Sequence, residues 1–191
     1  MKKYIIAVFI IALMLSGCSM NNVNPLDDGN VDLSKIENGI SSQIVSEQMA
    51  KQPKTITSYN NAYTLTLSRK WVEKQKGSLS KNENSLFECV MYSGDNINAS
   101  FNAVEYFTSA QTQMETFLSG IENYEQFLTE KNTQYVVFSK TEGEDGSKAG
   151  YYVFFIQAGD NCVQLMAKCK EVDIASYKAE FESVADSFQI K

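Results

Sequence analysis

The residues best suited to covalent chemistry in this chain are its four cysteines. Histidine is absent altogether. Without imidazole the chain cannot form a Ser-His-Asp or Cys-His catalytic group, and it lacks the ligand that most zinc and non-haem iron sites use. Proton transfer by Glu, Asp, Tyr or Lys stays open. Among the cysteines, Cys18 carries the most specific signal.

Cys18 stands at the far end of an apolar N-terminal segment. Two lysines precede an apolar run at residues 4–15, which is shorter than the roughly 20 residues of a membrane-spanning helix but fits the h-region of a signal peptide. The string "LSGC", which ends in Gly17-Cys18, resembles the lipobox of bacterial lipoproteins. This resemblance implies cleavage between Gly17 and Cys18 and a diacylglyceryl group on the Cys18 thiol. The alternative is an unprocessed anchor with an incidental cysteine.

The lipid predicts where the protein is held. Two acyl chains anchor a protein stably to a membrane, so we expect a bacterial cell-membrane protein, lipid-anchored on the extracytoplasmic face. Residues 19–32 are rich in Asn and Asp, and with Cys18 they form a predicted flexible tether, residues 18–32. Removal of residues 1–17 leaves 15 basic and 23 acidic residues, which is unfavourable for binding nucleic acid. The expected partners are the membrane, through the lipid, and an envelope protein.

The other three cysteines allow one disulfide at most. Cys162 and Cys169 lie on one predicted strand, about 23 Å apart, which is too far for a bridge. A disulfide would therefore join Cys89 to one of these two. The alternative is three buried free thiols that pack as small apolar side chains.

Hydrophobic periodicity divides the remaining chain into strands and helices. Alternation predicts strands at 63–72, 85–93, 98–107, 133–143, 148–158 and 162–170, and spacings of three and four predict helices at 33–51, 108–128 and 173–190. Thr108 with Gln111 suggests a capping box, and Asp173 is a predicted N-cap. Gly-containing turns are expected at 94–95, 143–146 and 159–161.

The strand at 148–158 predicts the layering, because its apolar residues point to both faces. A strand that is apolar on both faces is covered on both faces. The expected fold class is an α/β (α+β) sandwich: a mostly antiparallel six-stranded sheet with helices on both faces. Its β-β-β-α-β-β-β-α order follows an N-terminal helix at 33–51.

This order resembles the PsbP-like fold of a photosystem extrinsic protein and of small bacterial lipoproteins. The strings "YTLTLSRKWV" at 63–72 and "FESVADSFQI" at 181–190 are similar to that family's opening strand and closing helix, although Arg69-Lys70 replaces the usual Pro before the Trp. The resemblance covers about residues 55–191, within a single predicted globular domain at 33–191. It implies a non-catalytic accessory or binding role at a membrane.

No motif predicts an enzyme. The acidic loop at 142–145 does not match the spacing of an EF-hand, and neither phosphate-binding loops nor nucleophile elbows occur. We expect no metal and no cofactor. The leading hypothesis is a non-catalytic interaction module for an envelope complex. The alternative is a small-ligand-binding lipoprotein, with Trp71, Tyr151 and Phe155 lining a groove between the sheet and the N-terminal helix. An enzyme that uses Glu, Asp or Tyr is the third hypothesis.

Overall fold

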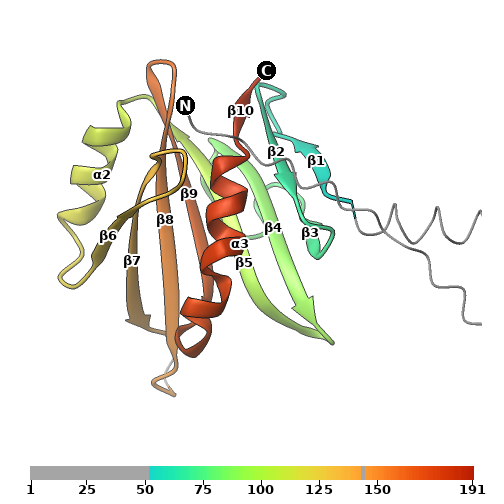
Figure 1. The fold of residues 1–191 in the computed structure, drawn as a ribbon, viewed down its shortest axis with the longest axis vertical. Coiled ribbons are helices and arrows are strands. Elements are labelled where there is room, and N and C mark those ends of the chain that lie inside the picture. Colours follow the sequence, from blue (N-terminus) through green and yellow to red (C-terminus); the bar gives the residue numbers. More distant parts are fainter. Residues whose placement is uncertain (1–51, 143–144) are drawn as a thin grey trace, which may run out of the picture. The chain divides into compact units, whose positions relative to one another are not determined.

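A seven-stranded antiparallel sheet is the centre of the fold (Figure 1). The structure is a computed structural model that describes residues 52–142 and 145–191. The strand order is β3-β4-β5-β9-β8-β7-β6. The strands are β3 (Trp71–Glu73), β4 (Ser85–Ser93), β5 (Asn96–Tyr106), β6 (Glu125–Leu128), β7 (Gln134–Thr141), β8 (Lys148–Ala158) and β9 (Asn161–Lys170).

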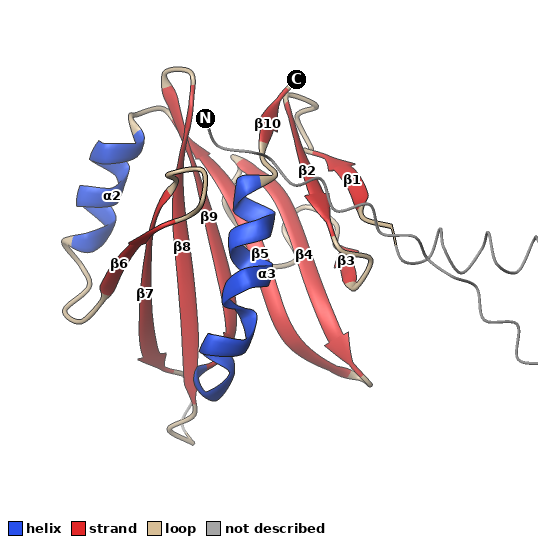
Figure 2. Ribbon diagram, viewed as in Figure 1, coloured by secondary structure: helices blue, strands red, loops and turns tan. Residues whose placement is uncertain are grey.

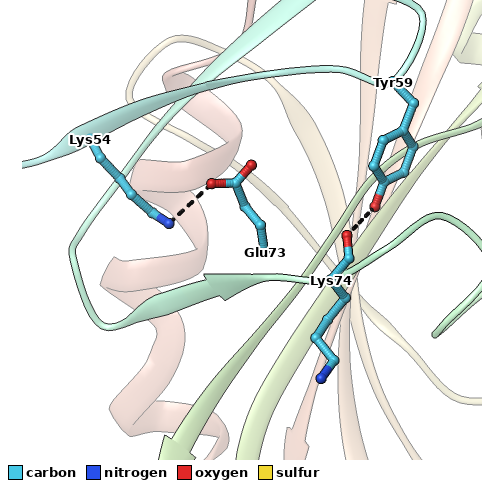
Figure 3. Close-up of polar contacts among 4 residues, drawn as sticks. All are labelled: Lys54, Tyr59, Glu73 and Lys74. Carbon is cyan, nitrogen blue, oxygen red and sulfur yellow. Dashed lines mark hydrogen bonds and ion pairs between the residues drawn. The ribbon is translucent and has the colours of Figure 1, made fainter.

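A second sheet of three short strands has the order β1-β2-β10. Its strands are β1 (Lys54–Thr57), β2 (Tyr63–Leu67) and β10 (Gln189–Ile190). Two polar contacts connect this part of the chain to β3 and the residue after it (Figure 3). The Lys54 ammonium lies 3.2 Å from Oε1 of Glu73, and the Tyr59 hydroxyl donates to the Lys74 carbonyl at 2.8 Å. The predicted strand at 63–72 covers both β2 and the start of β3, so it is two strands, one in each sheet.

The two described helices cover opposite faces of the large sheet, as predicted (Figure 2). Helix α3 (Ile174–Asp186) follows the short 3-10 helix η1 (Glu171–Asp173), and its Phe181 and Val184 pack in the larger hydrophobic cluster with Phe154 of β8. Helix α2 (Ala110–Leu118) places Met114 in a smaller cluster with Phe155. Since neighbouring side chains on a strand point to opposite faces, the two clusters lie on the two sides of β8.

The predicted helix at 108–128 is wrong over its second half. Helix α2 ends at Leu118, and residues 125–128 form the edge strand β6, which raises the sheet from the expected six strands to seven. The predicted capping box of Thr108 with Gln111 is also wrong. The N-cap is Ser109, whose hydroxyl oxygen accepts a hydrogen bond from the backbone N–H of Thr112. At the last helix Asp173 does hold the N-cap position, but without a side-chain capping bond.

Two predicted turns are confirmed. Gly94 joins β4 to β5 with φ +58°, and Gly159 joins β8 to β9 with φ +63°. An L side chain is strained in this left-handed region, so glycine suits both turns. The predicted turn at 143–146 includes two residues outside the described part of the chain. The predicted signal peptide 1–17, tether 18–32 and helix 33–51 also lie outside it, so those boundaries stay predictions.

Candidate functional site

A groove lies between helix α3 and the edge of the sheet formed by β6 and β7. Its volume is about 780 Å³. The residues that line it come from the segment before β6, from three neighbouring strands and from α3: Glu122, Asn123, Tyr124, Glu125, Phe127, Tyr135, Val137, Phe138, Ser139, Tyr152, Ile174 and Lys178. We refer to this site as the α3 groove.

Aromatic rings from adjacent strands line the α3 groove. Phe127 is directly opposite Tyr135 in the β6–β7 register, and their rings stack with centroids 5.4 Å apart. Tyr135 in turn stacks with Phe154, its partner on β8, at 4.8 Å, and with Tyr152 at 6.0 Å. Directly opposed aromatic pairs stabilise neighbouring strands, so the register builds this continuous aromatic stack. Tyr135, Tyr152 and Phe154 are buried in it, and Phe127 at the edge is half-buried.

Helix α3 fixes the hydroxyls of two of the three tyrosines that line the groove. Tyr135 donates to Oε1 of Glu182 at 2.5 Å, and Tyr152 donates to the carbonyl of Ile174 at 2.8 Å. Burial, followed by the hydrogen bond to Glu182, raises the pKa of Tyr135 well above its usual range. Burial also raises the pKa of Tyr152 to about 12. Both hydroxyls are therefore protonated at neutral pH, and they serve as structural donors.

The rim of the α3 groove carries charges of both signs. The Lys178 ammonium lies 5.1 Å from the centroid of the Phe127 ring, a distance at which a cation is attracted to an aromatic face. Glu122 and Glu125 are exposed on the opposite wall, and Tyr124 between them is 40% exposed. The arrangement presents apolar area bordered by polar groups, which suits recognition of another molecule.

A second pocket of about 790 Å³ lies near the first residues of β5 and β8 and the last residues of β9. Lys168 occupies one side of it, where its ammonium lies 5.8 Å from the Tyr151 ring centroid and forms an ion pair with Glu142. The residues following Glu142 are outside the described part of the chain. The α3 groove, whose walls are all described, is therefore the better-defined site.

The three residues predicted to form a ligand groove are not brought together. Trp71 lies in the larger cluster, where its ring meets Phe101 edge-on at 4.9 Å. Phe155 lies in the smaller cluster on the other side of the sheet, and Tyr151 points to that same side. All three are buried, and Trp71 lies on the opposite face of the sheet from Tyr151 and Phe155. The helix at 33–51 that was expected to cover it lies outside the described residues.

Sequence reasoning missed Phe127, Tyr135 and Lys178, which lie on β6, β7 and α3. Phe127 was assigned to a helix that the structure ends at Leu118. Tyr135 did have a usable signal, because its strand alternates, but the sequence does not show which residues oppose it. The contact between Lys178 and Phe127 depends on how α3 crosses the sheet, which no local pattern records.

The buried Glu88 and the half-buried Glu105 have structural partners. Glu88 accepts from the backbone N–H groups of Gly77 and Leu79 and from the Ser85 hydroxyl. Glu105 accepts from the hydroxyl of Tyr63 at 2.5 Å. Hydrogen-bonded in this way, these carboxylates hold loops and strands in place. Within residues 52–142 and 145–191, no three His, Cys, Asp or Glu side chains gather as metal ligands.

The cysteines of the folded part are free and buried, which was one of the two predicted arrangements. Burial raises the pKa of Cys89 to about 12 and the pKa values of Cys162 and Cys169 to about 11. Because the thiolate is the reactive form, these thiols are poor nucleophiles at neutral pH.

Comparison with known proteins shows the fold alone. No family model matches the sequence, and no curated protein matches it significantly. A crystal structure from Bacteroides thetaiotaomicron matches with a TM-score of 0.55 and 15% identity, covering 73% of this chain and 49% of that one, so the match spans about half of that protein. The Ran-binding protein Mog1p of Saccharomyces cerevisiae matches with a TM-score of 0.52 and 12% identity over 73% of this chain and 96% of its own.

Cyanobacterial PsbP (CyanoP) from Synechocystis sp. PCC 6803 is also among the similar structures. Its TM-score is 0.49 at 10% identity, covering 74% of this chain and 94% of that one, which is too distant to add to the assignment. The likeness to Mog1p places the described residues in a Mog1-like α+β fold, and a fold does not define an activity. None of the helices in the described part of the chain has the length and apolar character needed to cross a membrane.

Proposed function

We propose that this chain is a lipid-anchored envelope protein that acts as a non-catalytic interaction module, with the α3 groove as its binding surface. The observation that supports the proposal is the groove itself: the exposed Tyr124 and the half-buried Phe127 lie over buried tyrosines that are held by hydrogen bonds to α3, and exposed charges border them. Rigid aromatic surfaces with polar borders are typical of protein-binding sites.

The chemistry of the groove favours binding over catalysis. The hydroxyls of Tyr135 and Tyr152 already donate to α3, where Glu182 is the acceptor for Tyr135. Lys178 is exposed and lies at the face of Phe127. Neither a nucleophile next to a base nor a third group that orients such a base is present among the described lining residues.

The N-terminal segment supports the proposed location. The apolar run at 4–15 and the string that ends in Gly17-Cys18 resemble a lipoprotein signal. A diacylated Cys18 would keep the folded domain at a membrane surface, where it meets envelope partners repeatedly. The specific partner is what the following experiment identifies.

Site-directed photocrosslinking tests the groove. We would place p-benzoylphenylalanine at Tyr124, on the wall of the α3 groove, and as a matched control at Tyr92 on β4, since the two tyrosines are 40% and 42% exposed. In cells that make the anchored protein, position 124 should crosslink to a discrete membrane-associated protein and position 92 should not. The adduct should be lost in a Cys18→Ala chain. Identical adducts from both positions, or none from position 124, would contradict the proposal.

A small ligand is the second candidate, because the groove volume of about 780 Å³ falls within the range of about 300–1,000 Å³ found for small-molecule sites. This candidate predicts no protein adduct from position 124. Instead, a small-molecule extract of the envelope should raise the melting temperature of the protein, and Phe127→Ala should remove that increase. A protein adduct with no thermal shift would reject it.

A further inference from the structure

Strand β6 is a free edge of the seven-stranded sheet. It lies at the end of the strand order, and among the described strands it pairs only with β7, through Glu125 to Leu128. An unpaired edge presents a row of N–H and C=O groups that can accept another strand. Natural edges are commonly protected by lysine or proline, and β6, with the sequence EQFL, has neither.

The register identifies which backbone groups point outward. Thr129 donates its backbone N–H to the carbonyl of Thr133, and bonded pairs alternate along an antiparallel ladder. The bonded pairs of β6 are therefore Phe127 with Tyr135 and Glu125 with Val137. It follows that the N–H and C=O groups of positions 126 and 128 point away from β7, toward the open side.

Hollows lie on both faces of this edge. The α3 groove lies on one face, and a smaller pocket of about 420 Å³ lies beside Met114 of α2, lined also by Gln126 and Leu128. Side chains of an added strand alternate between the two faces of the sheet. An extended segment on β6 would therefore send alternate side chains toward the two hollows, where Leu128, which is 58% exposed, supplies apolar contact.

The charge along the edge is negative. Glu122, Glu125 and Glu130 are exposed, residues 122–130 contain neither Lys nor Arg, and none of the three glutamates has an ion-pair partner within the described residues. The nearest lysines are engaged with the protein itself: Lys131 donates to the carbonyl of Asp186, and Lys178 contacts the Phe127 ring. A segment that binds here gains from positive charge.

We propose that β6 receives an extended, basic segment of a partner protein as an added strand. This inference rests on the proposed function and specifies its partner class: main-chain hydrogen bonds to Gln126 and Leu128 provide affinity, apolar side chains fill the two hollows, and Lys or Arg side chains pair with the three glutamates. The short length of β6 limits the ladder to a few bonds, so the complex is reversible.

A peptide with defined chemistry tests the inference on the full lipidated chain in detergent. The probe is the capped heptapeptide Lys-Val-Val-Lys-Val-Val-Lys, which places Val and Lys on both faces of an added strand. It is compared with the Glu-Val peptide, in which Glu replaces each Lys, and with a Lys-Val peptide interrupted by a central Pro. Binding is followed by fluorescence anisotropy, and hydrogen exchange is followed by mass spectrometry. Only the uninterrupted basic peptide should bind, and it should slow exchange in the fragment that contains Gln126 and Leu128.

Two variants separate the backbone contribution from the charge contribution. Leu128→Pro removes one outward N–H while the bonds to β7 remain, and should weaken the peptide about fivefold; Leu128→Val keeps the N–H and is its control. A chain with Glu122→Lys and Glu125→Lys should come to prefer the Glu-Val peptide, whereas Glu83→Lys, on an exposed loop, should not. Hydrogen exchange of each variant without peptide confirms that the sheet is intact.

The outcomes separate this inference from the proposed function. Protection of the β6 amides, lost with Leu128→Pro, supports strand addition. Absence of binding by the basic peptide, or binding without protection at β6, overturns it. If the adduct from position 124 nevertheless persists in a Leu128→Pro chain, the α3 groove still binds a partner and only strand addition fails.

Discussion

Trp71 donates its indole N–H to Oε1 of Glu180 at 2.7 Å, and the Ser68 hydroxyl donates to the same oxygen at 2.7 Å. Trp71 begins β3 in the large sheet, Ser68 directly follows β2 in the small sheet, and Glu180 lies on α3. One carboxylate oxygen thus joins two sheets and a helix. The sequence pattern predicted β2 and β3 as one strand, and Glu180 holds the short segment that separates them.

We expect Glu180→Ala to lower the free energy of unfolding by about 1–3 kcal/mol, because it leaves the N–H of the buried Trp71 without an acceptor. Glu180→Gln keeps an acceptor oxygen and should cost less. Urea denaturation followed by Trp fluorescence measures both, since Trp71 is the one tryptophan. Glu83→Ala on the exposed loop is the control, and an equal loss in that variant would reject this role for Glu180.

Gly150 is predicted to tolerate no side chain. A Cβ at this position on β8 would overlap the side chain of Ile174, where α3 begins. Gly150→Ala should therefore lower the free energy of unfolding by about 1–3 kcal/mol, and adding Ile174→Ala should recover part of that loss, which a double-mutant cycle detects. Gly120→Ala is the matched control, since its Cβ would lie 3.8 Å from the Phe117 carbonyl oxygen. Additive losses at positions 150 and 174 would contradict the overlap.

The buried thiols predict a loss of stability at alkaline pH. Their pKa values are raised from 9.0 to about 12 for Cys89 and to about 11 for Cys162 and Cys169, so their contribution is complete below pH 9 and is lost as pH rises through the folded values. Chemical denaturation between pH 8 and 11 should show this decline, and a chain with all three replaced by Ala should decline less. Rapid alkylation of the native thiols at pH 7.5 would contradict their burial.

Lys178 is predicted to act in binding more than in folding. Lys178→Glu removes the cation from the face of Phe127 and adds a negative charge to the acidic rim, so a basic partner should give a photocrosslink from position 124 that is severalfold stronger. Its effect on the free energy of unfolding should stay within about 1 kcal/mol, because the side chain is exposed. Lys140→Glu, at an exposed position of β7 away from the groove lining, is the charge-matched control. Equal crosslinking by both variants would exclude Lys178 from the interface.

Cys18→Ala tests the predicted anchor directly. The wild-type chain should incorporate labelled palmitate and sediment with membranes, whereas the variant should do neither, because it lacks the thiol that accepts the lipid. Mass spectrometry of the mature N-terminus should begin at residue 18. Membrane sedimentation of the variant equal to that of the wild type would show that the apolar run at 4–15 stays attached as an anchor.

The layered fold could be predicted because it depends on local patterns. The sequence of β8 is apolar on both faces, and the glycine turns marked the hairpins β4–β5 and β8–β9. The α3 groove could not be predicted, because Tyr124 and Leu128 continue the helical spacing that begins at Met114. The helix instead stops at Leu118, where Ser119 and Gly120 follow, and periodicity alone does not detect that end.

The separation of Trp71 from Tyr151 and Phe155 could not be predicted for a related reason. Alternation correctly placed Tyr151 and Phe155 on one face of a strand. Alternation did not show whether Trp71 points to the same face of the sheet as these two residues, because β4, β5 and β9 lie between β3 and β8. Such relations depend on strand order, which a single sequence does not supply.

The strand order also has a kinetic consequence. The hairpins β4–β5 and β8–β9 join segments that are close in the sequence, whereas residues 99–106 of β5 pair with residues 162–169 of β9. Closing that long loop costs more chain entropy, so this central seam should be the last part of the large sheet to form and should set the rate at which that sheet folds. Until it closes, the facing edges of β5 and β9 are open to other chains, and aggregation competes with folding at this step.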